Sequence, residues 1–115
     1  MRGTLDDTRL TAAERQAILH LKRELKHRFP QVKKLILFGS AARGTAEPGS
    51  DVDLLVLTNH SLPMSVKHEI YDVVFDMNLR YDVNLSVICV GEDQWQKGPL
   101  FVPIRAEVER DGVPV

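Results

Sequence analysis

Residues 35–58 read LILFGSAARGTAEPGSDVDLLVLT, and this stretch decides the fold that the sequence predicts. An apolar run ends in Gly39-Ser40, a glycine-containing polar loop follows, and Ser50-Asp51-Val52-Asp53 leads into a second apolar run. Short apolar runs bounded by turn residues are typical of strands with both faces covered. The stretch therefore predicts two strands joined by a loop, with polar, chemically capable residues at both ends of that loop.

Asp51 and Asp53 have the spacing of two residues on one face of an extended strand. Successive strand side chains alternate between faces, so the two carboxylates point the same way and can converge on a divalent cation. Mg²⁺ suits them, since it binds one or two carboxylates together with substrate phosphates. The alternative is that both are solvated turn residues, and the D-x-D pattern alone does not decide between these interpretations.

Gly39-Ser40 and Arg43 have the properties of an anion-binding loop. Glycine lets the backbone turn sharply and approach a ligand, and backbone N–H groups with a serine hydroxyl can hold an anion. Arg43, the last residue of a predicted helical turn at residues 41–43, is a natural partner for a phosphate oxygen. The alternative is an ordinary turn with a solvated arginine.

Together the motifs resemble the nucleotidyltransferase superfamily related to DNA polymerase beta, in its minimal (MNT) branch. The matching residues are Gly39-Ser40, Arg43-Gly44, Ser50 and Asp51-Val52-Asp53-Leu54. The ten residues 41–50 separate the Gly-Ser pair from the first acid, which is the spacing of the antitoxin-type members. The resemblance implies an α/β fold, a nucleotidyltransferase core in which a small mixed β-sheet packs with helices.

The resemblance also implies a reaction, the transfer of AMP from ATP to an acceptor hydroxyl. Asp51 and Asp53 would hold Mg²⁺ and act in catalysis, as metal ions stabilise both oxygens of an in-line displacement. Nucleotide contacts would come from Gly39, Ser40, Arg43 and Ser50.

Many active relatives carry a third carboxylate on the next central strand. Here the polar-face positions of the predicted strand at residues 83–90 are Asn84 and Ser86, neither of which is a base. Asp82 has the same parity and is the first candidate for the third acid, although it lies at or before the start of the strand. Two other readings stay open: a different acid fills the role, or catalysis is weak or absent.

A partner protein follows from the resemblance, because minimal members are typically paired with a helical HEPN protein as the antitoxin of a toxin–antitoxin pair. Little sequence remains beyond the core, so the acceptor hydroxyl is expected on another molecule. The helix after Pro63, or the apolar Leu100, Phe101, Val102 and Ile104, would supply the docking surface. Two alternatives are a binding module that neutralises a partner without transfer, and a homo-oligomer that modifies a small molecule.

Composition fits one soluble domain over residues 1–115, with residues 1–10 flexible. Of the 115 residues 43% are hydrophobic and 27% charged, with a net charge of −1, which gives no overall bias toward nucleic acid or membrane. The single cysteine, Cys89, lies in an apolar run and is expected to be buried in a cytoplasmic protein. The basic cluster at residues 22–34 is read as a solvated face, or else as a contact for a polyanion or an acidic partner.

The remaining elements are predicted from periodicity and capping. Thr11 and Glu14 form a capping box that begins a helix ending near Arg28, before Pro30. Further elements are expected as strands over residues 34–38, 52–57 and 83–90, and as helices from near residue 63 to 81, over 92–96 and over 100–110.

Overall fold

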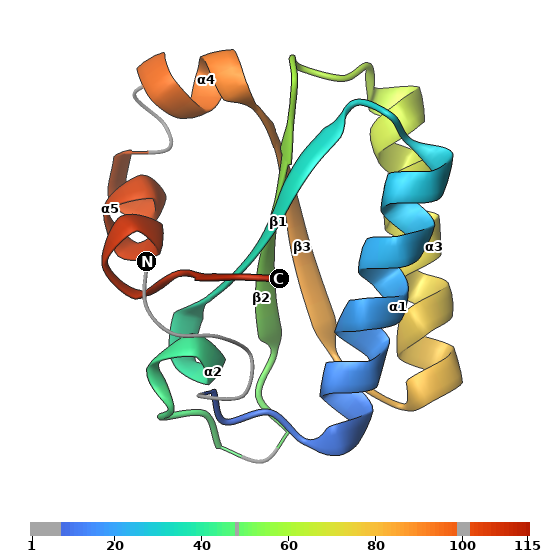
Figure 1. Cartoon of the computed structure of the whole chain (residues 1–115), viewed down its shortest axis with the longest axis vertical. Helices are drawn as coiled ribbons and strands as arrows, with labels where there is room; N and C mark the ends of the chain where they lie inside the picture. Colours follow the sequence, from blue (N-terminus) through green and yellow to red (C-terminus); the bar gives the residue numbers. More distant parts are fainter. Residues whose placement is uncertain (1–7, 48, 99–101) are drawn as a thin grey trace.

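The computed structural model describes residues 8–47, 49–98 and 102–115, and these form a four-stranded mixed sheet with helices on both faces (Figure 1). In chain order the elements are α1 (Ala12–Arg28), β1 (Val32–Phe38), α2 (Gly39–Arg43), β2 (Val52–Thr58), α3 (Met64–Tyr81), β3 (Leu85–Gly91), α4 (Glu92–Lys97), α5 (Val102–Asp111) and β4 (Val113–Pro114). The predicted α/β architecture with a small mixed sheet is confirmed. Predictions for residues 1–7 and 99–101 lie outside the described residues.

The strand order β3-β2-β1-β4 places β1 and β2, the strands on either side of the Gly-Ser loop, in the middle of the sheet. β1 pairs antiparallel with β2, and the pairing ends at Phe38 opposite Asp53. β2 and β3 are parallel, with α3 as the crossover between them, and Asp53 lies opposite Ser86. The end of β1 and the starts of β2 and β3 therefore meet at one edge of the sheet.

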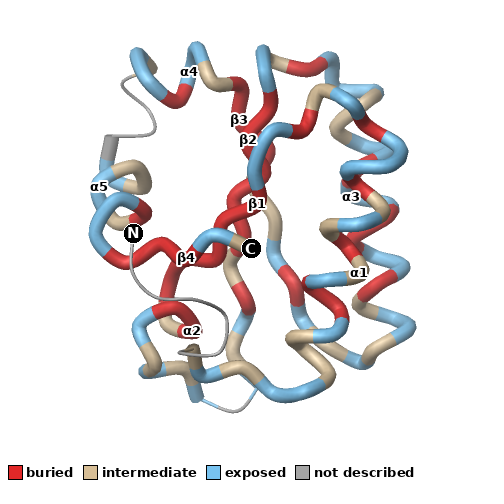
Figure 2. Tube along the Cα trace, in the orientation of Figure 1, coloured by how far each residue is buried: buried red, intermediate tan, exposed pale blue. Residues whose placement is uncertain are grey.

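Alternation along the strands divides the core into two layers. α1 and α3 cover one face together with Leu35, Leu37, Leu54 and Val56, whereas α4 and α5 cover the other with Ile36, Leu55 and Val90. Figure 2 shows the buried residues concentrated along the strands and on the inward sides of the helices. Cys89 is buried on the α1–α3 side, as predicted.

The helix ends follow the capping chemistry of the sequence. The Thr11 side chain accepts a bond from the Glu14 N–H at 3.1 Å, and the Glu14 carboxylate accepts one from the Thr11 N–H at 2.9 Å, so the predicted capping box is confirmed. The third strand begins at Leu85, two residues later than predicted, because Asp82 caps α3 and the Val83 N–H donates to the Asn78 carbonyl of that helix at 3.2 Å. Within the described residues no helix is long and apolar enough to span a membrane.

Candidate functional site

The Gly-Ser pair opens α2 directly at the end of β1. Gly39 has φ +78°, a left-handed conformation that favours glycine, and it turns the chain from the strand into the helix. Gly44 ends α2, also at φ +78°, and the Thr45 N–H donates to the Ser40 carbonyl at 2.9 Å. The first N–H groups of a helix have no partner within the helix, so this turn presents donors at the edge of the sheet.

The two acids lie beside this turn, on the β2 side. Asp53 is the second residue of β2 and has the parity of Leu55, so it faces the α5 side of the sheet. Asp51 is exposed and precedes the strand by one residue. The pKa of Asp53 is raised above its ordinary value of 3.8, mainly because the side chain is partly buried and next because Asp51 is negatively charged. The charge of Glu107 raises this pKa further, whereas the charge of Arg43 lowers it. Like charges that raise a carboxyl pKa indicate a place where a cation is favourable.

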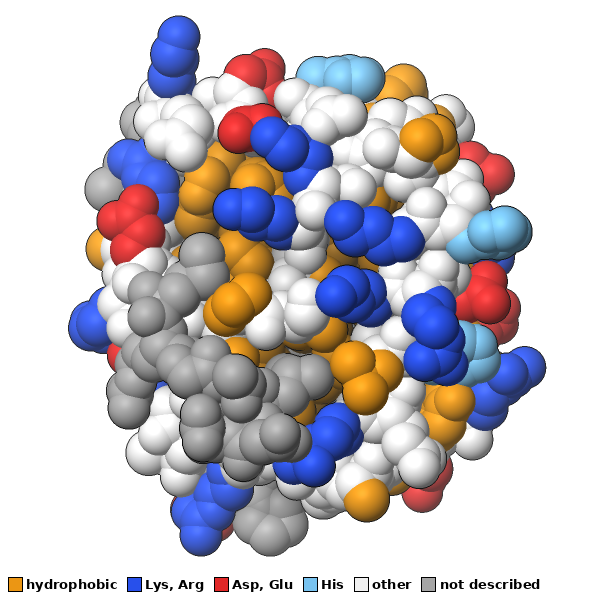
Figure 3. Space-filling model, viewed as in Figure 1, with side chains coloured by type: hydrophobic (Ala, Val, Ile, Leu, Met, Phe, Trp, Pro, Cys, Tyr) orange, Lys and Arg blue, Asp and Glu red, His pale blue; other side chains and the backbone are white. Residues whose placement is uncertain are grey.

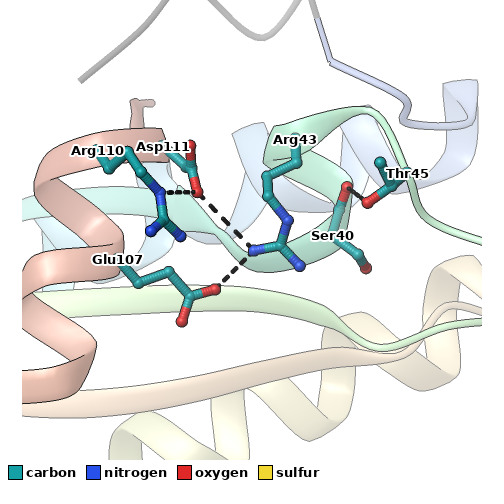
Figure 4. Close-up of polar contacts among 6 residues, drawn as sticks. All are labelled: Ser40, Arg43, Thr45, Glu107, Arg110 and Asp111. Carbon is teal, nitrogen blue, oxygen red and sulfur yellow. Dashed lines mark hydrogen bonds and ion pairs between the residues drawn. The ribbon is translucent and has the colours of Figure 1, made fainter.

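Arg43 is the residue that connects the loop to the far end of the chain. Its Nη1 lies 2.8 Å from Oε1 of Glu107 and 3.9 Å from Oδ2 of Asp111, both on α5 (Figure 4). Glu107 and Asp111 are not among the site residues that the sequence predicts. Their i,i+4 spacing would place two carboxylates on one helix face, but the predicted helix ends at residue 110, one residue before Asp111.

Ser50 is half-buried at the other side of the site. Its N–H donates to the Glu47 carbonyl at 3.0 Å, which closes the turn before Asp51. Ser50 and Asp51 line a cavity of about 280 Å³ together with residues of α1, α2 and the segment before α1, namely Arg9, Thr11, Glu14 and Ala41. This cavity gives a substrate group room next to Asp51.

Asp82, the candidate third acid, lies at the C-terminal end of α3. It is exposed, in the left-handed conformation (φ 55°), and caps the C-terminus of α3 three residues before β3 begins. Ser86 is the β3 residue opposite Asp53. No group of three His, Cys, Asp or Glu side chains able to hold a metal is found in the described part of the chain. A role for Asp82 in catalysis therefore stays a prediction.

The predicted basic cluster gathers at the β4 edge of the sheet. Lys22, Lys26, Lys33 and Lys34 line a groove of about 310 Å³ with Leu35, Pro114 and Val115. Figure 3 shows Lys and Arg side chains spread over this face of the molecule. The Lys26 amine donates to the Lys33 carbonyl at 2.8 Å, and Lys33 pairs with Glu92 at 2.7 Å, so two of the four amines already have partners within the chain.

A Gly-Ser turn that opens a short helix, beside an acid pair on the neighbouring strand, is the arrangement of a nucleotidyltransferase. A family model described as "Nucleotidyltransferase domain" matches residues 18–109, and the chain belongs to that family.

The curated relatives are three proteins of Methanocaldococcus jannaschii that carry the name "Putative protein adenylyltransferase". MJ1305 is 45% identical over 58 residues, which are 49% of this chain and 40% of the relative. MJ0141 is 36% identical over 58 residues, 50% of this chain and 59% of the relative. MJ0604 is 31% identical over 85 residues, 73% of this chain and 80% of the relative. The aligned region thus spans less than two thirds of the first two relatives.

Solved structures share the fold. One described as a "putative minimal nucleotidyltransferase" has a TM-score of 0.62 at 18% identity, covering 99% of this chain and 98% of that chain. A chain of a toxin–antitoxin crystal structure with AMP-PNP has a TM-score of 0.60 at 20% identity, covering 86% of this chain and 69% of that chain. A third match, at TM-score 0.56 and 16% identity, is a chain of a structure described as a tri-AMPylated Shewanella oneidensis HEPN toxin in complex with an MNT antitoxin. The match covers 87% of this chain and 69% of that chain.

Proposed function

We propose that this chain transfers AMP from ATP to a hydroxyl of a protein partner, and that the partner is a HEPN-type helical protein of a toxin–antitoxin pair. The observation that carries the proposal is the meeting of Gly39, Asp53 and Arg43 at one edge of the sheet, where an anion-binding turn lies next to an acid pair. The names of the relatives and the AMPylated toxin of the structural neighbour support a protein acceptor.

Asp51 and Asp53 fit a divalent cation. The charge of Asp51 raises the pKa of Asp53, so the two carboxylates lie close enough to repel each other. Two carboxylates are sufficient for Mg²⁺, which completes its coordination with waters and substrate phosphates. When bound, the metal would supply charge stabilisation to the attacking and leaving oxygens at the α-phosphorus.

The chain's own groups position the triphosphate. The turn at Gly39 and Ser40 presents backbone N–H groups and a hydroxyl, and both suit phosphate oxygens. Arg43 adds a positive charge one helical turn further on, where it would stabilise the charge on departing pyrophosphate. The cavity lined by Ser50 and Asp51 leaves space next to Asp51 for another part of the substrates.

α3 offers a docking surface for the partner. Phe75 and Leu79 are 61% and 68% exposed and lie four residues apart on one helix face. They occupy the last two turns of α3, which leads into β3 at the end of the sheet where Asp51 lies. A helical partner bound there would reach the edge of the sheet that carries the acid pair.

A labelling experiment tests the proposed function. The chain is incubated with Mg²⁺, α-labelled ATP and the product of the neighbouring gene, and transfer is compared with Asp51→Asn and Asp53→Asn variants. Asp93→Asn, which changes an exposed acid on α4, is the matched control. We expect label on the partner, its loss in both site variants, and its retention in the control. Phe75→Ser is expected to weaken association with the partner and to leave nucleotide binding unchanged.

A second candidate is a binding module that neutralises its partner by association alone. The observation in its favour is the lack of a three-acid group among the described residues, with Ser86 instead of an acid opposite Asp53. Tight association without label on the partner, unchanged in Asp53→Asn, would support this candidate over transfer.

A further inference from the structure

Helix α5 contributes two carboxylates to the site from outside the Gly-Ser and Asp-x-Asp motifs. Glu107 and Asp111 are one helical turn apart, and both approach Nη1 of Arg43, at 2.8 Å and 3.9 Å (Figure 4). Figure 4 shows the Arg43 guanidinium between α2 and α5, directed toward the acids of α5. The Arg43–Glu107 contact joins residues 64 positions apart in the sequence.

Burial distinguishes this arrangement from an ordinary surface ion pair. The Asp111 side chain is only 6% exposed and also accepts a bond from Nε of Arg110 at 2.9 Å. Glu107 and Arg43 are 32% and 37% exposed, so they remain open to a ligand at the rim. One guanidinium therefore lies next to a nearly buried acid and a half-exposed one.

We propose that Glu107 and Asp111 are positioning residues that hold the Arg43 guanidinium beside Asp53, ready to donate to the triphosphate. This inference rests on the proposed function, since the triphosphate is the anion that Arg43 would meet.

A held arginine binds an anion better than a freely rotating one. A free arginine side chain loses rotamer entropy when it binds, and fixing it beforehand removes part of that cost. The guanidinium has five N–H donors in a fixed fork, and Arg43 contacts Glu107 and Asp111 of α5 through Nη1. Nε and Nη2 are then oriented by a contact that Nη1 makes.

The Arg43–Glu107 pair also acts electrostatically on Asp53, one of the two proposed metal-binding acids. Glu107 raises the pKa of Asp53 and Arg43 lowers it, so both groups act on the same carboxylate. Glu107 would also repel a phosphate directly, an effect that does not depend on Arg43. An experiment must separate this direct repulsion from positioning.

A double-mutant cycle in nucleotide affinity makes that separation. Binding of a non-hydrolysable ATP analogue with Mg²⁺ is measured by calorimetry for wild type, Arg43→Ala, Glu107→Gln and the double variant. Direct repulsion by Glu107 is the same with or without Arg43 and cancels in the cycle. Glu69→Gln, which removes an exposed charge on α3, is the matched control, and circular dichroism verifies that each variant is folded.

We expect Arg43→Ala to weaken the affinity for the ATP analogue about tenfold in the wild-type background and less than about threefold in the Glu107→Gln background. The reason is that, without Glu107, the charge-assisted hydrogen bond from Arg43 to the nucleotide loses its orientation. In the Glu69→Gln background the tenfold loss is expected to persist. An equal loss in the wild-type and Glu107→Gln backgrounds would overturn the positioning role. A larger loss in the Gln background would overturn it too, because Glu107 would then hold Arg43 away from the nucleotide.

The cycle also separates this inference from the proposed function. Nucleotide binding with the expected coupling, but no label on any partner, would leave the inference standing and refute AMP transfer. Label transfer without coupling would do the reverse. Mg²⁺ titrations without nucleotide give a further readout: a large loss of metal affinity in Glu107→Gln would make Glu107 a metal ligand and overturn its role through Arg43.

Discussion

The Asp53 carboxylate occupies the space that a side chain at residue 39 would need. An ideal Cβ built on Gly39 would overlap Oδ2 of Asp53 and stand 3.2 Å from its Cγ. The backbone of the Gly-Ser turn and the acid of the neighbouring strand are thus in direct contact. The position of one determines the position of the other.

Gly39→Ala is therefore expected to displace Asp53 and to weaken binding of Mg²⁺ and nucleotide. Gly44→Ala is a matched control, because Gly44 has the same φ of +78° but nothing within 4 Å of an added Cβ. Both variants carry the strain of a left-handed non-glycine residue, about 1–2 kcal/mol in the free energy of unfolding. Only Gly39→Ala is expected to lose nucleotide affinity, measured by calorimetry; equal affinities would show that the contact with Asp53 is unimportant.

Asp53→Asn is expected to raise the melting temperature at neutral pH in metal-free buffer. The pKa of Asp53 is raised in the folded protein, so between 3.8 and the folded value the folded state binds more protons than the unfolded state. The free energy of unfolding therefore falls as the pH rises through this window, and the penalty persists above it. Replacing the acid removes the penalty.

Thermal unfolding at several pH values, in the presence of a chelator, measures this effect. The gain from Asp53→Asn is expected to shrink as the pH falls toward 3.8 and to exceed the gain from Asp72→Asn at pH 7. A destabilised Asp53→Asn protein at neutral pH would show that this carboxylate contributes favourable contacts that outweigh its burial.

Asp82→Asn tests the third-acid role that the sequence predicts for Asp82. Asparagine tolerates the left-handed conformation that Asp82 adopts at the end of α3, so the fold should be retained. Because Asp82 forms no metal-binding group with Asp51 and Asp53, we expect AMP transfer within about twofold of wild type, a difference well below the contribution of a general base. A loss of a hundredfold or more with unchanged stability would establish Asp82 as the base.

Alkaline unfolding is expected to depend on Cys89. Burial raises the pKa of the Cys89 thiol from 9.0 to about 11, partly offset by Tyr71 and Lys67. The unfolded chain then loses its thiol proton at a lower pH than the folded protein, so stability falls as the pH rises from 9 toward 11. The loss is about 2–3 kcal/mol for a shift of this size.

Cys89→Ala provides the comparison for this prediction. The variant is expected to be less stable than wild type at pH 7, because it removes a buried group, and the gap is expected to narrow above pH 9. Chemical unfolding at each pH measures the gap. A constant difference from pH 7 to 11 would contradict a thiol that stays protonated in the core.

Local patterns predict those parts of the fold that local chemistry determines. The capping box at Thr11, the alternation along β1 and β2, and the Gly-Ser turn each depend on residues a few positions apart, and each is found as expected. Strand β4 was not predicted, since it has two residues, includes Pro114, and pairs with Ile36 and Leu37 far away in the sequence. Only the folded sheet shows that this edge exists.

In the candidate site, too, the residues close together in the sequence could be predicted and the distant ones could not. Gly39, Ser40, Arg43, Ser50 and the acid pair belong to one continuous stretch, and their spacing was sufficient to select them. Glu107 and Asp111 belong to a helix whose sequence looks like an ordinary amphipathic segment with solvated acids. Their approach to Arg43 comes from the packing of α5 against α2, which no spacing within the motif encodes.

The link between Arg43 and α5 also has a consequence for biosynthesis. The Gly-Ser turn and the acid pair leave the ribosome long before Glu107 and Asp111 do, because 64 positions separate Arg43 from Glu107. A nascent chain would carry Arg43 without its contacts to Glu107 and Asp111 until α5 had packed against α2. The ability to bind a nucleotide through Arg43 would thus arise late in translation, after β1 and β2 had paired.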